Sequence, residues 1–210
     1  NRAYVPAKED DSHTNLYYDP VGNRITGRWI ETSAGRFLLA LNLSDLHFEW
    51  LNDRLRRQQA VSATGKDGRS LEREVGRFFA PAGLDEQLFY RPLHYDIPDY
   101  GFQAGGIAEF PEEGLDHWKF FRQLANTASD SFLGFLQARG ETRIWPHHFD
   151  TGVYAPVHDN LGIGFGLAME DPMIGRPYFY LAGYPSQGTI QYTGLPDLSQ
   201  GRWETGDQWQ

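Results

Sequence analysis

The sequence has no cysteine among its 210 residues. This absence excludes disulfide frameworks, thiolate nucleophiles and zinc or iron–sulfur centres held by cysteine. Basic residues are also few, since 19 Lys and Arg stand against 28 Asp and Glu and give a formal net charge of −9. This balance argues against a protein that binds nucleic acid or an anionic membrane, because both partners require a basic surface.

Long apolar runs and the common catalytic signatures are absent as well. The longest apolar run, Phe37 to Leu41, is far shorter than the ~20 residues that span a bilayer. The sequence contains no G-x-S-x-G elbow, no H-E-x-x-H helix, no EF-hand loop and no Walker A motif. Composition therefore predicts a soluble, acidic, cytoplasmic protein with neither a membrane nor a nucleic acid as partner, and it names no reaction.

Aromatic residues, glycine and proline are abundant. Aromatic side chains make up 15% of the chain, beside 23 glycines and 12 prolines, which is typical of short strands joined by tight turns. A chain of this length predicts a single domain, residues 1–210, with a substantial core. Within it we expect a loosely held arm (1–14), a β-rich half with a short helix (15–111), and a long helix followed by a meander and a tail (112–210).

The N-terminal half alternates in the manner of strands. Apolar and polar residues predict strands at Ile25–Thr32 and Arg36–Leu43 and a further strand through Leu46–Trp50. The stretch 53–69 is charged and contains glycine, and within it Gly65–Gly68 predicts a loop. Apolar residues at helical spacing from Leu71 to Phe79 then predict a short helix.

The strongest periodicity predicts a helix over 113–139. Six residues recur at spacings of three and four and predict an inward face: Trp118, Phe121, Ala125, Ala128, Phe132 and Phe135. The same wheel places Lys119, Arg122 and Asp130 toward solvent. Arg139 and Gly140 have the residue types expected at a helix C-terminus.

After Gly140 the period falls to two. Strands are expected at Arg143–Tyr154, Leu161–Met169 and Pro177–Tyr184, forming a three-stranded antiparallel meander. The predicted fold class is α+β, with antiparallel sheets near both ends of the chain and the long central helix packed on the C-terminal meander.

Histidine lies beside carboxylates or amides in the segments 13–15, 94–99 and 145–150. Imidazole serves both acid–base chemistry and metal ligation. If 145–150 is an extended strand, His148 and Asp150 share one face, and His147 lies with Trp145 and Phe149 on the other. For His148 and Asp150, structural pairing and a functional role both stay open, whereas a structural role is favoured for His147. His13 reads first as an exposed residue near a mobile start.

A second unusual pattern is the alternation of glycine with apolar residues over 161–167. In a strand, Gly162, Gly164 and Gly166 share one face, and glycine at such positions indicates that something packs closely on the backbone. Rings of Tyr178, Tyr180 or Trp145 lying on the glycines are one explanation. The other is the floor of a ligand site with tyrosine walls. The spacing does not match a dinucleotide fingerprint.

The segment W-P-H-H-F-D at 145–150 resembles an uncharacterised bacterial family of domains of unknown function, which carries this motif after a long helix. Further segments resemble the same family at His13–Leu16, His94–Pro98, Leu124–Ala128, Gly162–Gly164 and Pro177–Tyr180. Thr151 and Gly152 depart from the aliphatic residues usual there. The family has no assigned activity to carry over.

Two classes of function follow from these residues. In the first, an enzyme or metal site is built from imidazole and carboxylate, with His147, His148, Asp150 and His94 as catalytic candidates. A divalent metal would then be held by His148, Asp150, His94 and His13, as ligand types of this kind suit zinc, nickel, manganese or non-haem iron. In the second, a non-catalytic module binds a small apolar or sugar-like ligand in an aromatic groove formed by Tyr178, Tyr180, Gly164 and Trp145.

Overall fold

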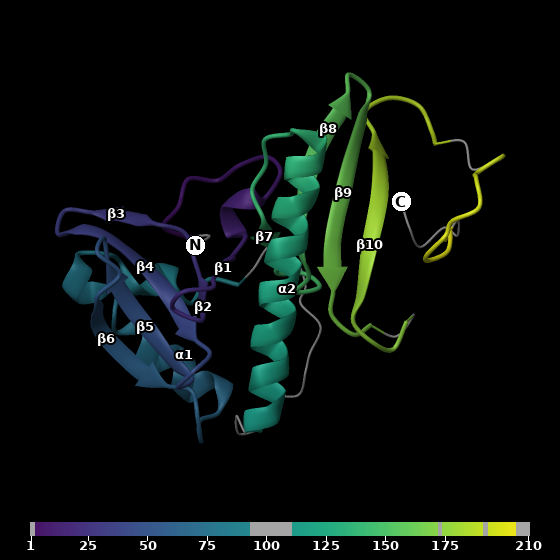
Figure 1. Ribbon diagram of the computed structural model, residues 1–210. Coiled ribbons are helices and arrows are strands. Elements are labelled where there is room, and N and C mark those ends of the chain that lie inside the picture. Colours follow the sequence, from purple (N-terminus) through teal and green to yellow (C-terminus); the bar gives the residue numbers. More distant parts are fainter. Residues whose placement is uncertain (1–2, 93–110, 172–173, 191–192, 205–210) are drawn as a thin grey trace.

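The computed structural model describes residues 3–92, 111–171, 174–190 and 193–204 and confirms the α+β class (Figure 1). The N-terminal sheet contains β1 (Tyr17–Asp19), β2 (Arg24–Thr26), β3 (Ile30–Thr32), β4 (Gly35–Asn42), β5 (His47–Asn52) and β6 (Arg57–Ser62). The C-terminal sheet contains β7 (Arg143–Ile144), β8 (Thr151–His158), β9 (Leu161–Ala168) and β10 (Tyr178–Pro185). The helices are α1 (Gly68–Gly76) and α2 (Glu112–Leu136), with 3₁₀ helices at Ser12–Thr14, Ala80–Ala82 and Glu86–Leu88.

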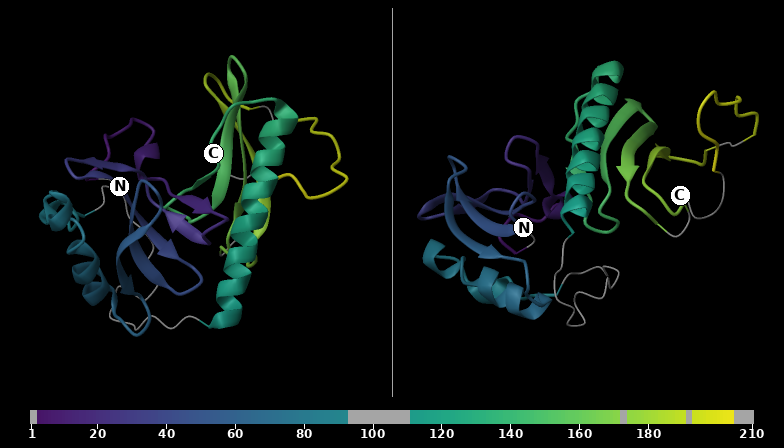
Figure 2. Two further views of the ribbon diagram at one scale, coloured as in Figure 1. Left: turned by 60° about the vertical axis from the view of Figure 1, so that its left-hand side comes forward. Right: turned by 60° about the horizontal axis from the view of Figure 1, so that its bottom comes forward.

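Both sheets are antiparallel and follow the chain closely. The N-terminal sheet has the order β1-β2-β4-β5-β6, with β3 paired to β4, and the C-terminal sheet has the order β10-β9-β8-β7. The helix α2 packs on β8 and β9, and Figure 2 (right) shows it between the two sheets. No helix in the described ranges is long and apolar enough to cross a bilayer.

Two details of the N-terminal sheet differ from the sequence prediction. The expected strand Ile25–Thr32 is divided into β2 and β3, which both pair with β4. The charged stretch 53–69, in which the sequence predicted only a loop at Gly65–Gly68, also contains β6, which pairs with β5. Residues 63–67 connect β6 to α1, so the loop itself is confirmed. An edge strand needs a partner on one side only, so polar and charged side chains are tolerated there.

The N-terminal core lies between this sheet and the α1 region. Trp50 on β5 is 1% exposed and packs edge-on against Phe79 at a centroid distance of 5.1 Å. Phe37 on β4 stacks on the indole at a centroid distance of 5.4 Å. The residues after α1 therefore bury the aromatic face of β4 and β5, which gives the short helix its fixed position.

The helix α2 buries a face shifted by about one residue from the predicted one. Ala125 is buried and Phe132 stacks on Phe165 at 4.7 Å, as expected of an inward face. However, Arg122 is fully buried and Phe135 is 84% exposed, so both of these assignments were wrong. The buried stripe contains Arg122 and Ser129, and a hydrophobicity pattern cannot select polar residues for the core.

The C-terminus of α2 also lies earlier than predicted. Gln137 adopts a left-handed conformation with φ of 52°, and its backbone N–H donates to the carbonyl of Gly134. The N–H of Ala138 donates to the Leu133 carbonyl at 3.0 Å. The helix is therefore closed without using Arg139 or Gly140, since a left-handed residue already satisfies its last carbonyls.

A backbone bridge joins the two halves of the molecule. Leu16 pairs with Ile144 in an isolated antiparallel bridge, and each donates its N–H to the carbonyl of the other at 3.0 and 2.7 Å. Ile144 is fully buried and packs with Tyr18, Ile25 and Leu43. This small core fixes β7 against the N-terminal sheet.

Candidate functional site

The motif at 145–150 forms a tight turn between β7 and β8, and the prediction of a continuous strand from Arg143 to Tyr154 was wrong. Residues 146–148 form the turn. The Trp145 N–H donates to the Asp150 carbonyl at 2.9 Å, and the Phe149 N–H donates to the Trp145 carbonyl at 2.8 Å. His148 and Asp150 therefore do not share a strand face. Proline is disfavoured within a ladder but suited to a turn, which explains the break at Pro146.

Arg122 of α2 contacts the residues that follow the 146–148 turn. Its Nη1 donates to Thr151 Oγ1 at 2.6 Å, and its Nη2 donates to the Phe149 carbonyl at 2.5 Å. The guanidinium carbon also lies 4.8 Å from the centre of the Phe149 ring and 5.8 Å from that of Trp118. Phe149 itself has a φ of 57°, which is uncommon for a bulky residue. These contacts together maintain the unusual backbone of the turn.

Arg122 carries its charge at 0% exposure. Loss of hydration lowers the pKa of its guanidinium to about 10, and the nearby charge of Asp150 acts in the opposite direction. The guanidinium Nε has no hydrogen-bond partner among the described residues. A cation in this position is expensive to bury, so its two hydrogen bonds to the turn are structurally significant.

Asp150 and Tyr180 form the second polar contact of the turn. The Tyr180 hydroxyl donates to Asp150 Oδ2. Burial raises the pKa of the Asp150 carboxyl above its usual value, although the Tyr180 hydrogen bond and the charges of His148 and Arg122 act to lower it. Burial, and then the Asp150 charge, raises the pKa of the Tyr180 hydroxyl. The hydroxyl therefore stays protonated near neutral pH and serves as a donor.

Tyrosine rings cover the row of glycines on β8 and β9. A Cβ placed on Gly166 would lie 2.7 Å from Tyr180 Oη, and one placed on Gly164 would lie 2.8 Å from Tyr184 Cε2. The same construction on Gly162 collides with the ring of Tyr154. The register pairs Tyr180 directly with Gly166 across β9 and β10. The glycines are thus required for close approach of rings, and Tyr180 behaves as one sequence interpretation predicted.

These rings form an exposed aromatic surface, here called the tyrosine face, made of Tyr154, Tyr180 and Tyr184. Tyr154 and Tyr184 are 50% and 41% exposed, and their ring centres lie 6.0 Å apart. The Asp150 charge contributes to raised pKa values at Tyr180 and Tyr184, after the larger effect of burial. The tyrosine face therefore lies within the electrostatic field of the half-buried Asp150 carboxylate.

Tyr178 of β10 brings a second carboxylate, that of Asp171, close to the tyrosine face. Its hydroxyl donates to Asp171 Oδ2 at 2.6 Å. Burial, the Asp171 contact and the more distant Asp150 charge together raise the pKa of the Tyr178 hydroxyl. The sequence of β8, β9 and β10 contains no lysine or arginine. Among the predicted ligand-binding residues, Tyr180 and Gly164 belong to the tyrosine face or its floor, whereas Trp145 lies half-buried at the start of the turn.

The predicted histidine site is only partly described. His13 is buried, not exposed, and its Nδ1 accepts a hydrogen bond from the Lys8 N–H at 3.2 Å, within a segment that was expected to be loosely held. His148 is exposed on the turn and His147 is half-buried. His94 lies outside the described residues. Across the described ranges, no group of three or more His, Asp or Glu side chains is arranged to hold a metal ion.

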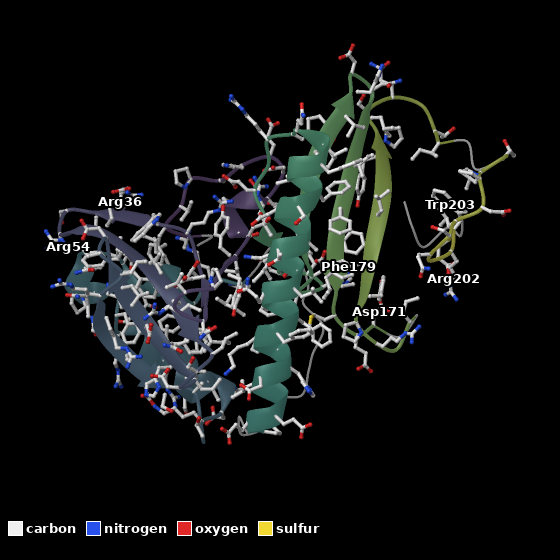
Figure 3. The ribbon with its side chains drawn as sticks, in the orientation of Figure 1. Arg36, Arg54, Asp171, Phe179, Arg202 and Trp203 are labelled. Atoms are coloured by element: carbon white, nitrogen blue, oxygen red, sulfur yellow. The ribbon has the colours of Figure 1, made fainter. Side chains whose placement is uncertain are left out.

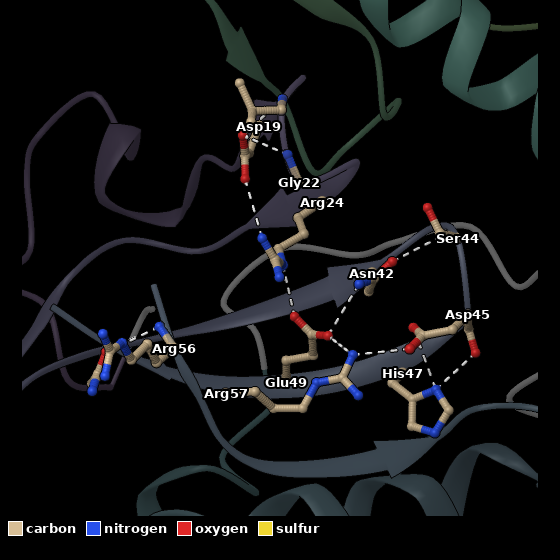
Figure 4. A network of polar contacts seen from close by, with 12 residues as sticks. Asp19, Gly22, Arg24, Asn42, Ser44, Asp45, His47, Glu49, Arg56 and Arg57 are labelled. Carbon is tan, nitrogen blue, oxygen red and sulfur yellow. Dashed lines mark hydrogen bonds and ion pairs between the residues drawn. The ribbon is translucent and has the colours of Figure 1, made fainter. Parts of the chain in front are cut away.

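A separate buried charge network was not foreseen from the sequence (Figure 4). Glu49 on β5 is fully buried and accepts hydrogen bonds from Arg24 Nε at 2.7 Å and Asn42 Nδ2 at 3.1 Å. Arg57 contacts the same carboxylate and also donates to Asp45 Oδ2 at 2.9 Å. These side chains tie β2, β4, β5 and β6 together, so the network stabilises the sheet.

Arg122 and the covering tyrosines Tyr154 and Tyr184 are the site residues that sequence reasoning missed. Arg122 occurs at a polar position of an amphipathic helix and gave no signal. Tyr154 pairs with Gly164 and Tyr184 pairs with Gly162. Paired residues share a face of the sheet, so strand alternation and register could have placed both tyrosines on the glycine face.

Comparison with known proteins adds no assignment. No family model, no curated protein and no solved structure matches the chain. The resemblance of the W-P-H-H-F-D segment therefore stays a prediction.

Proposed function

We propose that this protein is a binding module without chemistry of its own, and that the tyrosine face holds a small organic cation. The observation that supports this proposal is the position of Asp150, whose carboxylate acts electrostatically on Tyr180 and Tyr184 at once. Aromatic ring faces carry negative charge density and attract ammonium and guanidinium groups. Rings and carboxylate together therefore favour a cation.

The surroundings of the tyrosine face support the same charge preference. The strands β8 to β10 contain no lysine or arginine that would compete for the rings. The guanidinium of Arg122 lies near Asp150, and its hydrogen bonds go to Thr151 and to the Phe149 carbonyl. An anionic ligand would meet the carboxylates of Asp150 and Asp171, and no lysine or arginine of β8, β9 or β10 would offset them.

The rings are also physically available. Half of the Tyr154 side chain and 41% of Tyr184 are exposed, and each is supported from behind by glycine backbone. Rings held in fixed positions lose little conformational freedom when a ligand binds. A histidine-based enzyme is less well supported, because His148 is exposed on the 146–148 turn.

The proposal is tested by titrating the protein with tetramethylammonium, followed by NMR of the tyrosine ring protons. We expect saturable binding with a Kd on the order of 1 mM. Tyr184→Leu should weaken binding by about 2- to 30-fold, since one cation–π contact contributes roughly 0.5–2 kcal/mol. Asp150→Asn should also weaken it, whereas the matched charge control Asp116→Asn on α2 should leave it unchanged.

One neutral probe and one anionic probe test whether binding depends on the positive charge of the ligand. Methyl glucoside and benzoate should bind less tightly than tetramethylammonium. Affinity for the cation should fall as the pH is lowered through the raised pKa of Asp150, because the protonated carboxyl no longer attracts it. Stronger binding of the sugar, or no saturable binding of any probe, would contradict the proposal.

A further inference from the structure

The strand β10 forms one edge of the C-terminal sheet and is unusually unprotected. It is eight residues long, and β9 is its only partner among the described strands. No charged residue occurs between Arg176 and Asp197. Exposed edges are normally blocked by charged side chains, bulges or very short strands, because unpaired backbone groups invite a further strand.

The α2-side face of β10 is also apolar, and it is covered at Gly183 by Ile190 but exposed at Phe179 and Leu181. Phe179 and Leu181 are 44% and 56% exposed. Phe179, labelled in Figure 3, stacks on Phe165 of β9 at 5.6 Å. Phe165 in turn stacks on Phe132 of α2. The stacked rings thus extend from α2 to β10 at the edge of the sheet. The helix itself packs on β8 and β9.

We infer that a second copy of this chain pairs with the edge of β10 in antiparallel orientation, about a two-fold axis at Tyr180. In this register Tyr180 faces its own counterpart, and Phe179 of each copy lies opposite Leu181 of the other. Directly opposed residues point to the same face of an antiparallel sheet. The register therefore covers both exposed apolar side chains of each copy, and the sheets join as one.

Charge favours this place of contact over others. Two copies with a formal net charge of −9 each repel one another over most of their surfaces. The segment from Pro177 to Pro196 carries no charged side chain, so identical segments meet there without like-charge contacts. Phe179 and Leu181 lie on the opposite side of the sheet from the tyrosine face, and Tyr180 is the one member of that face at the two-fold axis.

The expected association is weak. Stable interfaces bury about 1,200–2,000 Å² in total, and pairing of one short edge with two apolar side chains per copy falls below this range. Sedimentation of the full chain between about 5 and 500 µM should show the mass rising from monomer toward dimer. Leu181→Lys should abolish the rise, and Phe135→Lys, which changes an equally apolar exposed residue on α2, should not. A monomer at all concentrations would overturn the inference.

The register is tested by disulfide cross-linking. The natural chain has no cysteine, so only the introduced residues can form a disulfide. Phe179→Cys and Leu181→Cys are prepared separately, then oxidised alone and as a mixture. Opposed residues have Cα atoms 4.5–5.5 Å apart, within the range of a disulfide, whereas diagonal ones lie about 7–8 Å apart. Cross-linked dimer should form in the mixture and not with either variant alone. Equal cross-linking in all three samples would overturn the register.

Discussion

Arg122 of α2 and Thr151 of β8 are joined by a hydrogen bond of 2.6 Å inside the protein, between Nη1 and Oγ1. The same guanidinium holds the carbonyl of Phe149. One side chain of the helix therefore fixes both the end of the 146–148 turn and the start of the central strand pair. The position of Asp150, between these two contacts in the chain, depends on it.

Replacing Arg122 should destabilise the protein strongly. Arg122→Ala leaves the Phe149 carbonyl and Thr151 Oγ1 without their donor, and each buried group left unsatisfied costs about 1–3 kcal/mol. We expect a loss of about 2–4 kcal/mol in the free energy of unfolding, measured by urea denaturation. Arg122→Lys should lose less stability than Arg122→Ala but should stay below the natural protein, because lysine keeps the charge and lacks the planar guanidinium. Arg139→Ala, an exposed arginine beyond the helix, should stay within ~0.5 kcal/mol.

Asp150 should make stability depend on pH in the acidic range. Its folded-state pKa is raised by burial, so the folded protein binds a proton more readily than the unfolded chain. Stability contributed by the group is therefore lost as the pH rises from the unfolded value of 3.8 through the raised folded value. Asp150→Asn removes this titration and should gain stability relative to the natural protein as the pH rises from 3 to 7.

Urea denaturation at several pH values measures this difference. At a pH below 3.8 the carboxyl is protonated in both states and the two proteins should differ least. A difference that stays constant with pH would show that the Asp150 pKa is not raised.

Two glycine substitutions should have opposite signs. A Cβ on Gly152 would lie 2.8 Å from the Phe165 carbonyl oxygen and 2.9 Å from Tyr180 Oη, so Gly152→Ala should cost about 1–3 kcal/mol through overpacking. Gly134 lies within α2, where a Cβ meets nothing within 4 Å. Gly134→Ala should raise stability by about 0.5–1 kcal/mol, because alanine is the better helix former. Thermal unfolding of both variants tests the pair.

The two phenylalanines of the α2 C-terminal turns should behave differently. Phe132 stacks on Phe165, and Phe132→Ala should cost about 2–3 kcal/mol, less than full burial would give. Phe135 is 84% exposed, so Phe135→Ala should change stability by no more than ~0.5 kcal/mol. Equal losses at both positions would mean that the helix presents a different face to the sheet.

The sequence was sufficient where backbone periodicity alone decides the structure. The strands at Leu161–Ala168 and Tyr178–Pro185 and the helix at Glu112–Leu136 lie close to the predicted ranges. Hydrophobic alternation and helical spacing report which residues are buried together, and in these elements burial follows hydrophobicity.

The candidate site was harder to predict because burial there does not follow hydrophobicity. Arg122 enters the core through two hydrogen bonds whose partners lie in a distant turn. Phe149 takes a left-handed conformation that its side chain disfavours. Such features arise from tertiary contacts between α2 and the 146–148 turn, and neither segment shows them alone. The glycine row was visible in the sequence, but its covering rings depended on strand register.

The bridge between Leu16 and Ile144 bears on the order in which the chain can fold during synthesis. Every strand of the N-terminal sheet leaves the ribosome before Ile144 does, because β6 ends at Ser62. Synthesis proceeds at about 5–20 residues per second, so the N-terminal sheet has several seconds in which to form alone. During this time the backbone groups of Leu16 lack their partner, and they pair with Ile144 once β7 has been synthesised. The first half of the protein thus acts as the template on which the second half is assembled.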